Sequence, residues 1–177
     1  MINRITTPLT EQTVGRLKAG MRLLIDGTII TARDAAHVRI IDDAAKGKKP
    51  PFDPQGTVIY YVGPTPTPPG KIIGAAGPTT SSRMDPFMES MLKLGIKGFI
   101  GKGQRSEEVV RLLKKYRAVY CAAIGGAGAL IAQKIKSNEI IAFPELGPEA
   151  VRRLEVRDFP VIVVNDVFGN DALKHLR

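Results

Sequence analysis

Segments of two different periodicities alternate along the middle of this 177-residue chain. Between residues 71 and 143 we expect strands at KIIGAAG, KGFIG, AVYCAAI and EIIAF, and helices at MDPFMESMLKLG, SEEVVRLLKKYR and ALIAQKI. Strands that alternate with helices usually form a mainly parallel sheet with the helices packed on it. The pattern therefore predicts an α/β fold with a parallel core.

The regions on either side of this core are also rich in strand signals. We expect a strand or hairpin in LLIDGTIITA around the turn signal Asp26-Gly27, and a further strand in TVIYYVG. Between them, the pattern predicts a helix that Asp34 caps and Gly47 ends. VRRLEVRDFPVIVVND predicts two strands around an Asp158-Phe159-Pro160 turn. These flanks are expected to add a second sheet layer, so that residues 1–177 form a single β/β/α domain.

Composition limits the class of protein. A chain of this length can bury one core, and 44% apolar with 24% charged residues is typical of a soluble globular protein. The apolar runs are too short for a membrane span and no secretory leader opens the sequence, so we expect a cytoplasmic protein. The single cysteine, Cys121, excludes an internal disulfide and a metal site built from several thiolates of this chain. Its apolar neighbours predict a buried strand cysteine.

The formal charge of +9 favours acidic partners, which include nucleic acid, an acidic protein surface and small anions. Proteins that bind single strands usually combine basic residues with exposed aromatic rings, whereas this chain has 6% aromatic residues and no tryptophan. A binding module for RNA or an acidic protein, with GKKPP and RRLEVR as contacts, stays open as an alternative. We expect a protein that binds no nucleic acid.

Four turns are expected to connect a strand to the helix or loop that follows it. They are TARD, GPTTSSRMD, GKGQR and GGAG. Ligands of parallel α/β sheets gather at the carboxyl ends of the strands, where these turns would lie side by side. The side chains brought together would be Arg33, Thr79, Thr80, Arg83 and Lys102. Such a set suits a small anion with two carboxylates.

Each of these features also has a purely structural interpretation. The hydroxyl residues 79–82 are typical of a helix N-cap, and Ser82 with Asp85 has the spacing of a capping box. Arg33 can be a solvated charge at a strand end, and a lone His37 is more often a packing or orienting residue than a base. The chain has no H-E-x-x-H, no C-x-x-C and no P-loop pattern. It therefore offers anion-binding groups and hydroxyls, which is half of a catalytic site.

Four segments carry a family resemblance: TARDAAH (31–37), GPTTSSRMD (77–85), GKG (101–103) and CAAIGGAGAL (121–130). In this order they resemble the β subunit of iron–sulfur-dependent class I fumarases and tartrate dehydratases, which is also the C-terminal domain of the single-chain enzymes. The resemblance implies a swivelling β/β/α domain. It also implies a hetero-oligomer with an α subunit that carries a 4Fe–4S cluster, so the cluster thiolates would belong to that partner.

The resemblance also implies a reaction and roles for individual residues. The reaction is the reversible hydration of fumarate to L-malate, catalysed by a hydro-lyase that is active only with its α subunit, and tartrate is the alternative substrate. Arg33, Arg83 and Lys102 would bind the substrate carboxylates, and Thr79 would be the base that takes a proton from malate. A carboxylate that assists Thr79 is expected from the α subunit. Supporting roles are expected for Thr80, Asp34, His37 and Asp85.

Overall fold

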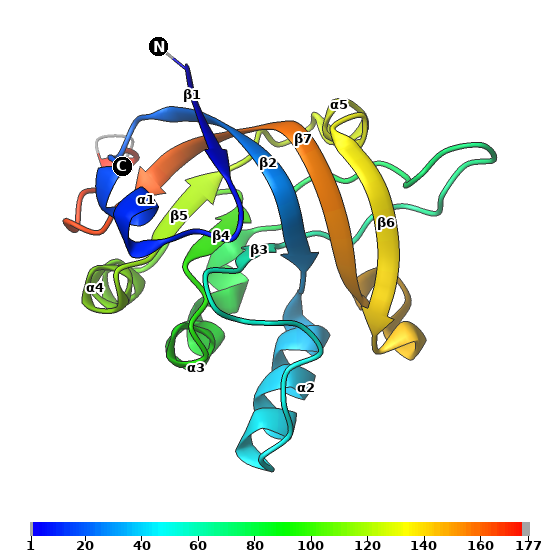
Figure 1. The fold of residues 1–177 in the computed structure, drawn as a ribbon, viewed down its shortest axis with the longest axis horizontal. Helices are drawn as coiled ribbons and strands as arrows, with labels where there is room; N and C mark the ends of the chain where they lie inside the picture. Colours follow the sequence, from blue (N-terminus) through cyan, green and yellow to red (C-terminus); the bar gives the residue numbers. More distant parts are fainter. Residues whose placement is uncertain (1, 175–177) are drawn as a thin grey trace.

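The computed structural model describes residues 2–174, which form one sheet of seven strands and the helices around it (Figure 1). The strands are β1 (Ile2–Thr6), β2 (Arg22–Thr31), β3 (Val58–Tyr60), β4 (Gly98–Gly101), β5 (Val119–Ala122), β6 (Ile135–Ala142) and β7 (Val151–Asn165). Their order in the sheet is β1-β2-β3-β4-β5-β7-β6, and β2 also pairs with β7. Because of that extra pairing, β2, β3, β4, β5 and β7 close into a barrel-like ring.

The pairs from β1 to β5 are parallel, and β7 pairs antiparallel with β2, β5 and β6. The mixed α/β class expected from the sequence is therefore confirmed, and the parallel core is confirmed in part. Of the strands expected between residues 71 and 143, β4 and β5 lie in it, whereas the EIIAF strand is part of β6 and pairs antiparallel with β7. The expected second sheet layer is wrong, because β7 enters the same sheet and closes it. One long strand can do this since its two ends pair with opposite sides of the parallel segment.

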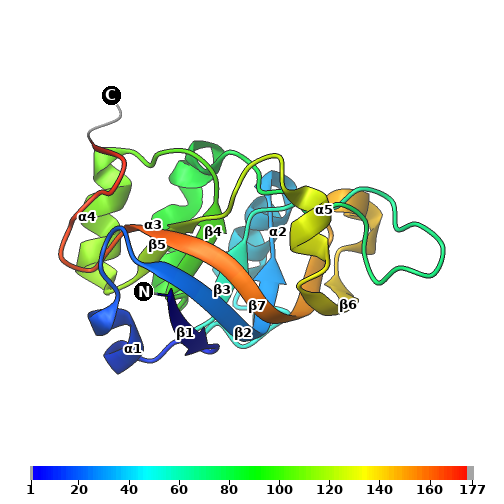
Figure 2. The ribbon, with the colours of Figure 1, turned by 90° about the horizontal axis from the view of Figure 1, so that it is seen from above.

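Successive side chains of the ring strands face two different cores, as the alternation of a strand requires. Ile29, Ile100 and Cys121 point into the ring, where the short helices α1 (Glu11–Arg16) and α5 (Gly128–Ala132) contribute to the same core. Ile30 and Phe99 point outward to a second core. That outer core lies beneath α2 (Asp34–Ala45), α3 (Met88–Lys93) and α4 (Glu107–Tyr116), which Figure 2 shows along one side of the ring.

The helices follow their sequence signals closely. Ser106 caps α4 by accepting a hydrogen bond from the backbone N–H of Val109 at 3.3 Å, and Val109 and Leu113, four residues apart, are both buried. The segment MDPFMESMLKLG is helical as expected, but it is divided into a 3-10 helix (Ser81–Phe87) and α3. In α2 the N-cap residue is Arg33, and Asp34 is the first helical residue. The predicted capping role of Asp34 is therefore wrong, although its charge still favours the helix N-terminus.

The predicted turn at Asp158-Phe159-Pro160 is absent, and of the two alternatives at Asp26-Gly27 the strand is confirmed and the hairpin is not. Asp26-Gly27 lies inside the continuous strand β2 and Asp158 inside the continuous strand β7. The β2–β7 register shifts between Ile25 and Gly27, so the two turn signals oppose each other in one β-bulge. The Asp26 carboxylate accepts a hydrogen bond from the backbone N–H of Asp158 at 2.7 Å. Gly27 at φ 108° and Asp158 at φ 54° supply the left-handed backbone that the bulge needs.

The predicted strand KIIGAAG is wrong as well. Residues 63–76 form an extended arm that projects from the body of the molecule as the turquoise-green loop of Figure 1. Its backbone bonds locally and to α5: the N–H of Thr65 donates to the carbonyl of Ala75 at 3.0 Å, and that of Ala76 to the carbonyl of Gly128 at 3.0 Å. Within residues 2–174, no helix is long and apolar enough to cross a membrane.

Candidate active site

The carboxyl ends of β2, β3 and β4 lie next to one another. Residues 79–82, which we call the hydroxyl segment, connect them. The N–H of Ala32 donates to the carbonyl of Tyr60 at 3.2 Å, and that of Thr79 to the carbonyl of Tyr61 at 2.7 Å. On its other side, the carbonyl of Thr79 accepts from the N–H of Lys102 at 3.1 Å. The segment therefore extends the sheet beyond the ends of β3 and β4. This places Thr79 between the turn that holds Arg33 and the turn that holds Lys102.

Arg33, Asp34 and Arg83 form a connected cluster of charges. Arg83 donates from Nε and Nη2 to the two carboxylate oxygens of Asp34, at 3.1 and 3.0 Å. Arg33 Nη2 lies 3.7 Å from the same carboxylate. Two of the predicted cations therefore meet at one acidic residue. The Arg83 side chain is half exposed and remains open to a further anion.

The Arg33 side chain is more enclosed and is held by residues that the sequence did not single out. Its Nη2 lies 3.6 Å from Glu149, whose other oxygen accepts from the backbone N–H of Ala35 at 2.8 Å and so satisfies the start of α2. A Cβ at Gly63 would lie 2.6 Å from Arg33 Nη1, so glycine there leaves room for the guanidinium. Neither Glu149 nor Gly63 could be found from the sequence, since each lies far from Arg33 along the chain.

Thr79 and Lys102 present unpaired side chains. Within the described part of the chain, the Thr79 hydroxyl makes no hydrogen bond and the Lys102 ammonium has no acidic partner. Lys102 and Thr80 are exposed, and Thr79 is half buried. The interpretation of the hydroxyls as a helix cap is not supported, because Thr80 occupies the N-cap position without a side-chain hydrogen bond.

His37 lies beneath the cluster, inside the outer core. Its ring stacks on Phe87 with 5.4 Å between centroids, and its Nδ1 is 2.7 Å from the carbonyl of Arg33. Burial lowers the pKa of His37 to about 4, against the opposing effect of the Arg33 carbonyl. At neutral pH the ring is therefore uncharged, with Nδ1 as the donor to that carbonyl. The contacts make His37 a residue that orients the start of α2.

Asp85 points away from the cluster and joins a buried network. It accepts from Arg105 Nε at 2.7 Å and from the backbone N–H of Ser106 at 3.0 Å. The Arg105 side chain is fully enclosed, lies over the rings of Tyr61 and Tyr120, and donates to the Tyr61 hydroxyl at 3.2 Å. Of the predicted supporting residues, Asp34 therefore lies with the cations and Asp85 does not. The capping box of Ser82 and Asp85 does not form.

The glycine-rich turn of residues 125–128 packs against the loop that leads into the hydroxyl segment. A Cβ at Gly128 would lie 2.9 Å from the backbone nitrogen of Gly77, so glycine lets the two backbones approach. Gly125 lies beside Lys102, whose Cδ would be 3.7 Å from a Cβ at that position. The GGAG turn therefore packs against the loops that carry Thr79 and Lys102.

The basic stretches considered as nucleic-acid contacts are partly used within the chain. Arg152 Nη1 donates to Asn138 at 3.2 Å and Arg153 Nη1 pairs with Glu139 at 3.1 Å, both across β6 and β7. Lys48 pairs with Asp43 at 2.9 Å. No contact among these residues favours a nucleic-acid interface over a solvated surface.

Cationic side chains lie at the carboxyl ends of the parallel strands, which is where α/β domains commonly bind small-molecule ligands. Residues 2–176 match the protein family described as Fumarase C-terminus, and the chain belongs to this family. It is 36% identical over 98% of its length to "Fumarate hydratase class I, aerobic" of Salmonella typhimurium. It is also 40% identical over 91% of its length to "Fumarate hydratase 2" of Leishmania major.

These two relatives are much longer proteins. The chain spans 30% of the Salmonella protein and 29% of the Leishmania protein. By contrast, it spans 89% of "Putative L(+)-tartrate dehydratase subunit beta" of Methanocaldococcus jannaschii, with 40% identity over 95% of the present chain. The family is therefore found both as part of a long chain and as a separate subunit, and the resemblance inferred from the four motifs is confirmed.

Proposed function

We propose that this chain, as one domain over residues 1–177, is the β part of a hydro-lyase that reversibly hydrates fumarate to L-malate. In this proposal Arg33, Arg83 and Lys102 bind the substrate carboxylates, and Thr79 transfers the proton. Thr80 and Asp34 support them at the same edge of the sheet. The names of the relatives, which are hydratases and a dehydratase, support this class of reaction.

One observation carries the proposal. The unpaired hydroxyl of Thr79 lies on a segment that joins the strand ends of Arg33 and Lys102, while Arg83 follows on the same segment. A dicarboxylate needs two cationic clamps at a separation set by its carbon chain, with a proton-transferring group between them. The helix-cap alternative gives no reason for an unpaired Thr79 hydroxyl.

The Arg83–Asp34 pair does not prevent such a site from binding an anion. Both side chains are substantially exposed, and exposed ion pairs contribute about 0–1 kcal/mol. A substrate carboxylate can therefore share or replace Asp34 on Arg83 at small cost. A guanidinium matches a carboxylate with two parallel hydrogen bonds, which also fixes the orientation of the substrate.

The chemistry of the side chains fits proton transfer next to a carboxylate. Removal of a proton from malate places negative charge on the neighbouring carboxylate, and guanidinium and ammonium groups stabilise that charge. A threonine hydroxyl is a weak base alone, so Thr79 requires a carboxylate that accepts its proton. We propose that the partner subunit supplies it.

The residues of this chain do not fit a 4Fe–4S cluster. Such clusters are held by several cysteine thiolates, and the chain has one cysteine. Cys121 points into the ring core, where burial raises the pKa of its thiol to about 12. No group of three potential metal ligands occurs within residues 2–174. We propose that an α subunit holds the cluster in a cytoplasmic hetero-oligomer.

The experiment is co-expression with the α subunit, followed by anaerobic assays on fumarate, malate and tartrate. We expect turnover by the complex, none by this chain alone, and a preference for fumarate and malate. A complex that acts on tartrate alone would assign the alternative substrate. Robust hydratase activity of the isolated chain would contradict the proposal that it requires an α subunit.

A Thr79→Val variant tests the proton transfer within that complex. Valine keeps the shape of threonine and lacks the hydroxyl, so kcat should fall by roughly 10²–10⁴-fold while the melting temperature stays unchanged. Ser82→Ala is the matched control, since Ser82 is an exposed hydroxyl residue of the same segment with no role in the proposed site. A Thr79→Val complex with normal kcat would remove Thr79 from the mechanism.

A further inference from the structure

A buried chain of hydroxyls lies beneath the proposed site. The Ser81 hydroxyl donates to the Tyr120 hydroxyl at 2.8 Å, and Tyr120 in turn donates to the carbonyl of Gly103 at 2.8 Å. Ser81 and Tyr120 are both fully buried. Ser81 is two residues from Thr79, and Gly103 is the neighbour of Lys102. One tyrosine hydroxyl therefore connects the two loops that carry the proposed base and the proposed ammonium.

The surroundings fix the Tyr120 ring. Tyr120 lies on β5 and faces the outer core, and the Arg105 guanidinium lies 5.2 Å from the centre of its ring. Burial raises the pKa of the Tyr120 hydroxyl, so this hydroxyl keeps its proton and stays a donor. Arg105 is itself held by Asp85, so the support extends to the start of α4. The ring is therefore a rigid part of the sheet.

The Ser81 hydroxyl lies so close to Gly101 that no side chain fits at this position. A Cβ at Gly101 would lie 2.0 Å from the Ser81 hydroxyl oxygen and 3.2 Å from the carbonyl of Thr79. The backbone ladder between the two loops passes over this position, with the N–H of Ser81 donating to the carbonyl of Lys102 at 2.9 Å. The absence of a side chain at Gly101 allows Ser81 to reach Tyr120 while the ladder stays intact.

We propose that Tyr120 is a positioning residue, which sets the separation between Thr79 and Lys102 through Ser81 and Gly103. This inference rests on the proposed function for its catalytic consequence. For the structure, it means that the backbone hydrogen bonds between the hydroxyl segment and Lys102 depend on the Tyr120 hydroxyl. A displacement of the reacting groups by about 1 Å can cost a large factor in rate. Weaker backbone hydrogen bonds between the two loops should therefore lower turnover.

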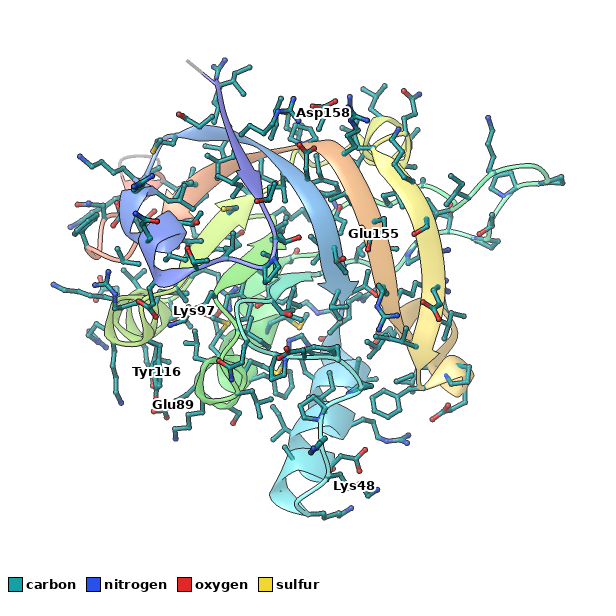
Figure 3. The ribbon with its side chains drawn as sticks, viewed as in Figure 1. Lys48, Glu89, Lys97, Tyr116, Glu155 and Asp158 are labelled. Carbon is teal, nitrogen blue, oxygen red and sulfur yellow. The ribbon has the colours of Figure 1, made fainter. Side chains whose placement is uncertain are left out.

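Tyr120→Phe in the complex with the α subunit tests the proposal. The variant keeps the ring and removes both hydrogen bonds. We expect kcat to fall by about tenfold or more. We also expect faster hydrogen exchange at the amides of Ser81 and Lys102. Tyr116→Phe is the matched control, because its hydroxyl donates to Glu89 at 3.1 Å and this pair lies between α4 and α3, away from the site (Figure 3). The control should change neither kcat nor those two amides.

The two readouts separate the failure of this inference from that of the proposed function. If the unmodified complex has no hydratase activity, the proposed function fails and amide exchange alone decides the role of Tyr120. Unchanged exchange at Ser81 and Lys102 in Tyr120→Phe would overturn the inference, and so would unchanged kcat in an active complex. If Tyr120→Phe does not fold, Ser81→Ala replaces it, since this variant removes the first of the two hydrogen bonds. The same two results are then expected.

Discussion

Two arginine–aspartate pairs meet at the 3-10 helix, and they differ in burial. Arg83 and Asp85 are two residues apart on this helix, and each finds its partner elsewhere in the chain. In the Arg83–Asp34 pair the side chains are 51% and 32% exposed, whereas in the Arg105–Asp85 pair they are 0% and 17% exposed. The same two residue types are thus used once at the surface and once in the core.

The difference in burial separates a binding role from a structural one. An exposed pair contributes little to stability and can exchange its partner for a ligand. A buried pair contributes little net energy when complete, but the loss of one member leaves a charge without compensation. We therefore expect Arg83 variants to affect catalysis and Arg105 variants to affect folding.

The largest expected effect is that of Arg105→Met. Methionine removes the positive charge beside Asp85 and the donor to Tyr61, and loss of one member of a buried pair costs about 3–5 kcal/mol. In a chain of this size that corresponds to a melting temperature lower by roughly 10 °C. Arg83→Met is the control and should change the melting temperature by a few degrees at most. Equal losses in the two variants would contradict the comparison.

The second expected effect is a pH dependence of stability that His37 causes. Its pKa is about 4 in the folded chain and about 6.5 when unfolded, because burial opposes its charge. Between these values the unfolded chain binds more protons. Stability is therefore full above about pH 6.5 and falls as the pH approaches 4, by about 3 kcal/mol in total. Arg105 and Asp34 also act on this ring, in opposite directions.

Denaturant unfolding at several pH values measures this dependence. His37→Gln keeps a donor for the Arg33 carbonyl but does not titrate, so its stability should fall less than that of the natural chain between pH 6.5 and 4. Parallel curves for the two proteins would show that the titration of His37 does not destabilise the fold.

Arg83→Lys and Arg33→Lys come next. Lysine keeps the charge but loses the planar fork, so each lost contact should cost about 1.5–3 kcal/mol of transition-state binding, or roughly ten- to over a hundredfold in kcat/KM. The melting temperature of the Arg83 variant should change little, since Arg83 is half exposed. Wild-type kcat/KM in both variants would show that the guanidinium groups of Arg33 and Arg83 do not bind the substrate.

The sequence predicted the elements whose signals are local. The helix at α4 has its cap and its buried face within ten residues, and the turn that carries Lys102 follows β4, which the sequence placed in the parallel core. The segment that carries Thr79 instead follows the extended arm of residues 63–76, where no strand forms. The sequence predicted a turn at Asp158 and left a hairpin open beside the strand at Asp26-Gly27, because a β-bulge between two strands uses the same residue types as a hairpin turn. KIIGAAG has the apolar residues of a strand, yet among residues 2–174 its backbone pairs with no strand, and pairing partners are not visible in a short segment.

Within the site, the sequence indicated which side chains gather but not how they pair. Asp34 and Asp85 are both acidic residues beside an arginine, and only the structure shows that one lies with the cations and the other in the core. Glu149 and Tyr120 act through contacts with residues far away in the chain. Such contacts depend on how segments distant in the sequence pack together, which no local pattern specifies.

The smallest expected effect is that of Asp34→Asn, and it addresses how Arg83 is held. Asparagine keeps an acceptor oxygen but removes the charge, so one hydrogen bond of the fork can remain. Loss of an exposed pair and of an acidic group in the first turn of α2 should lower stability by about 1 kcal/mol or less. If Asp34 only orients Arg83, KM should rise by up to about fivefold, which is that same 1 kcal/mol, and kcat should stay close to normal. The kinetics of the complex and its melting temperature measure both effects. A loss of kcat as large as that of Arg83→Lys would instead mean that Asp34 contacts the substrate or Thr79, and the exposed pair would then be part of the catalytic machinery.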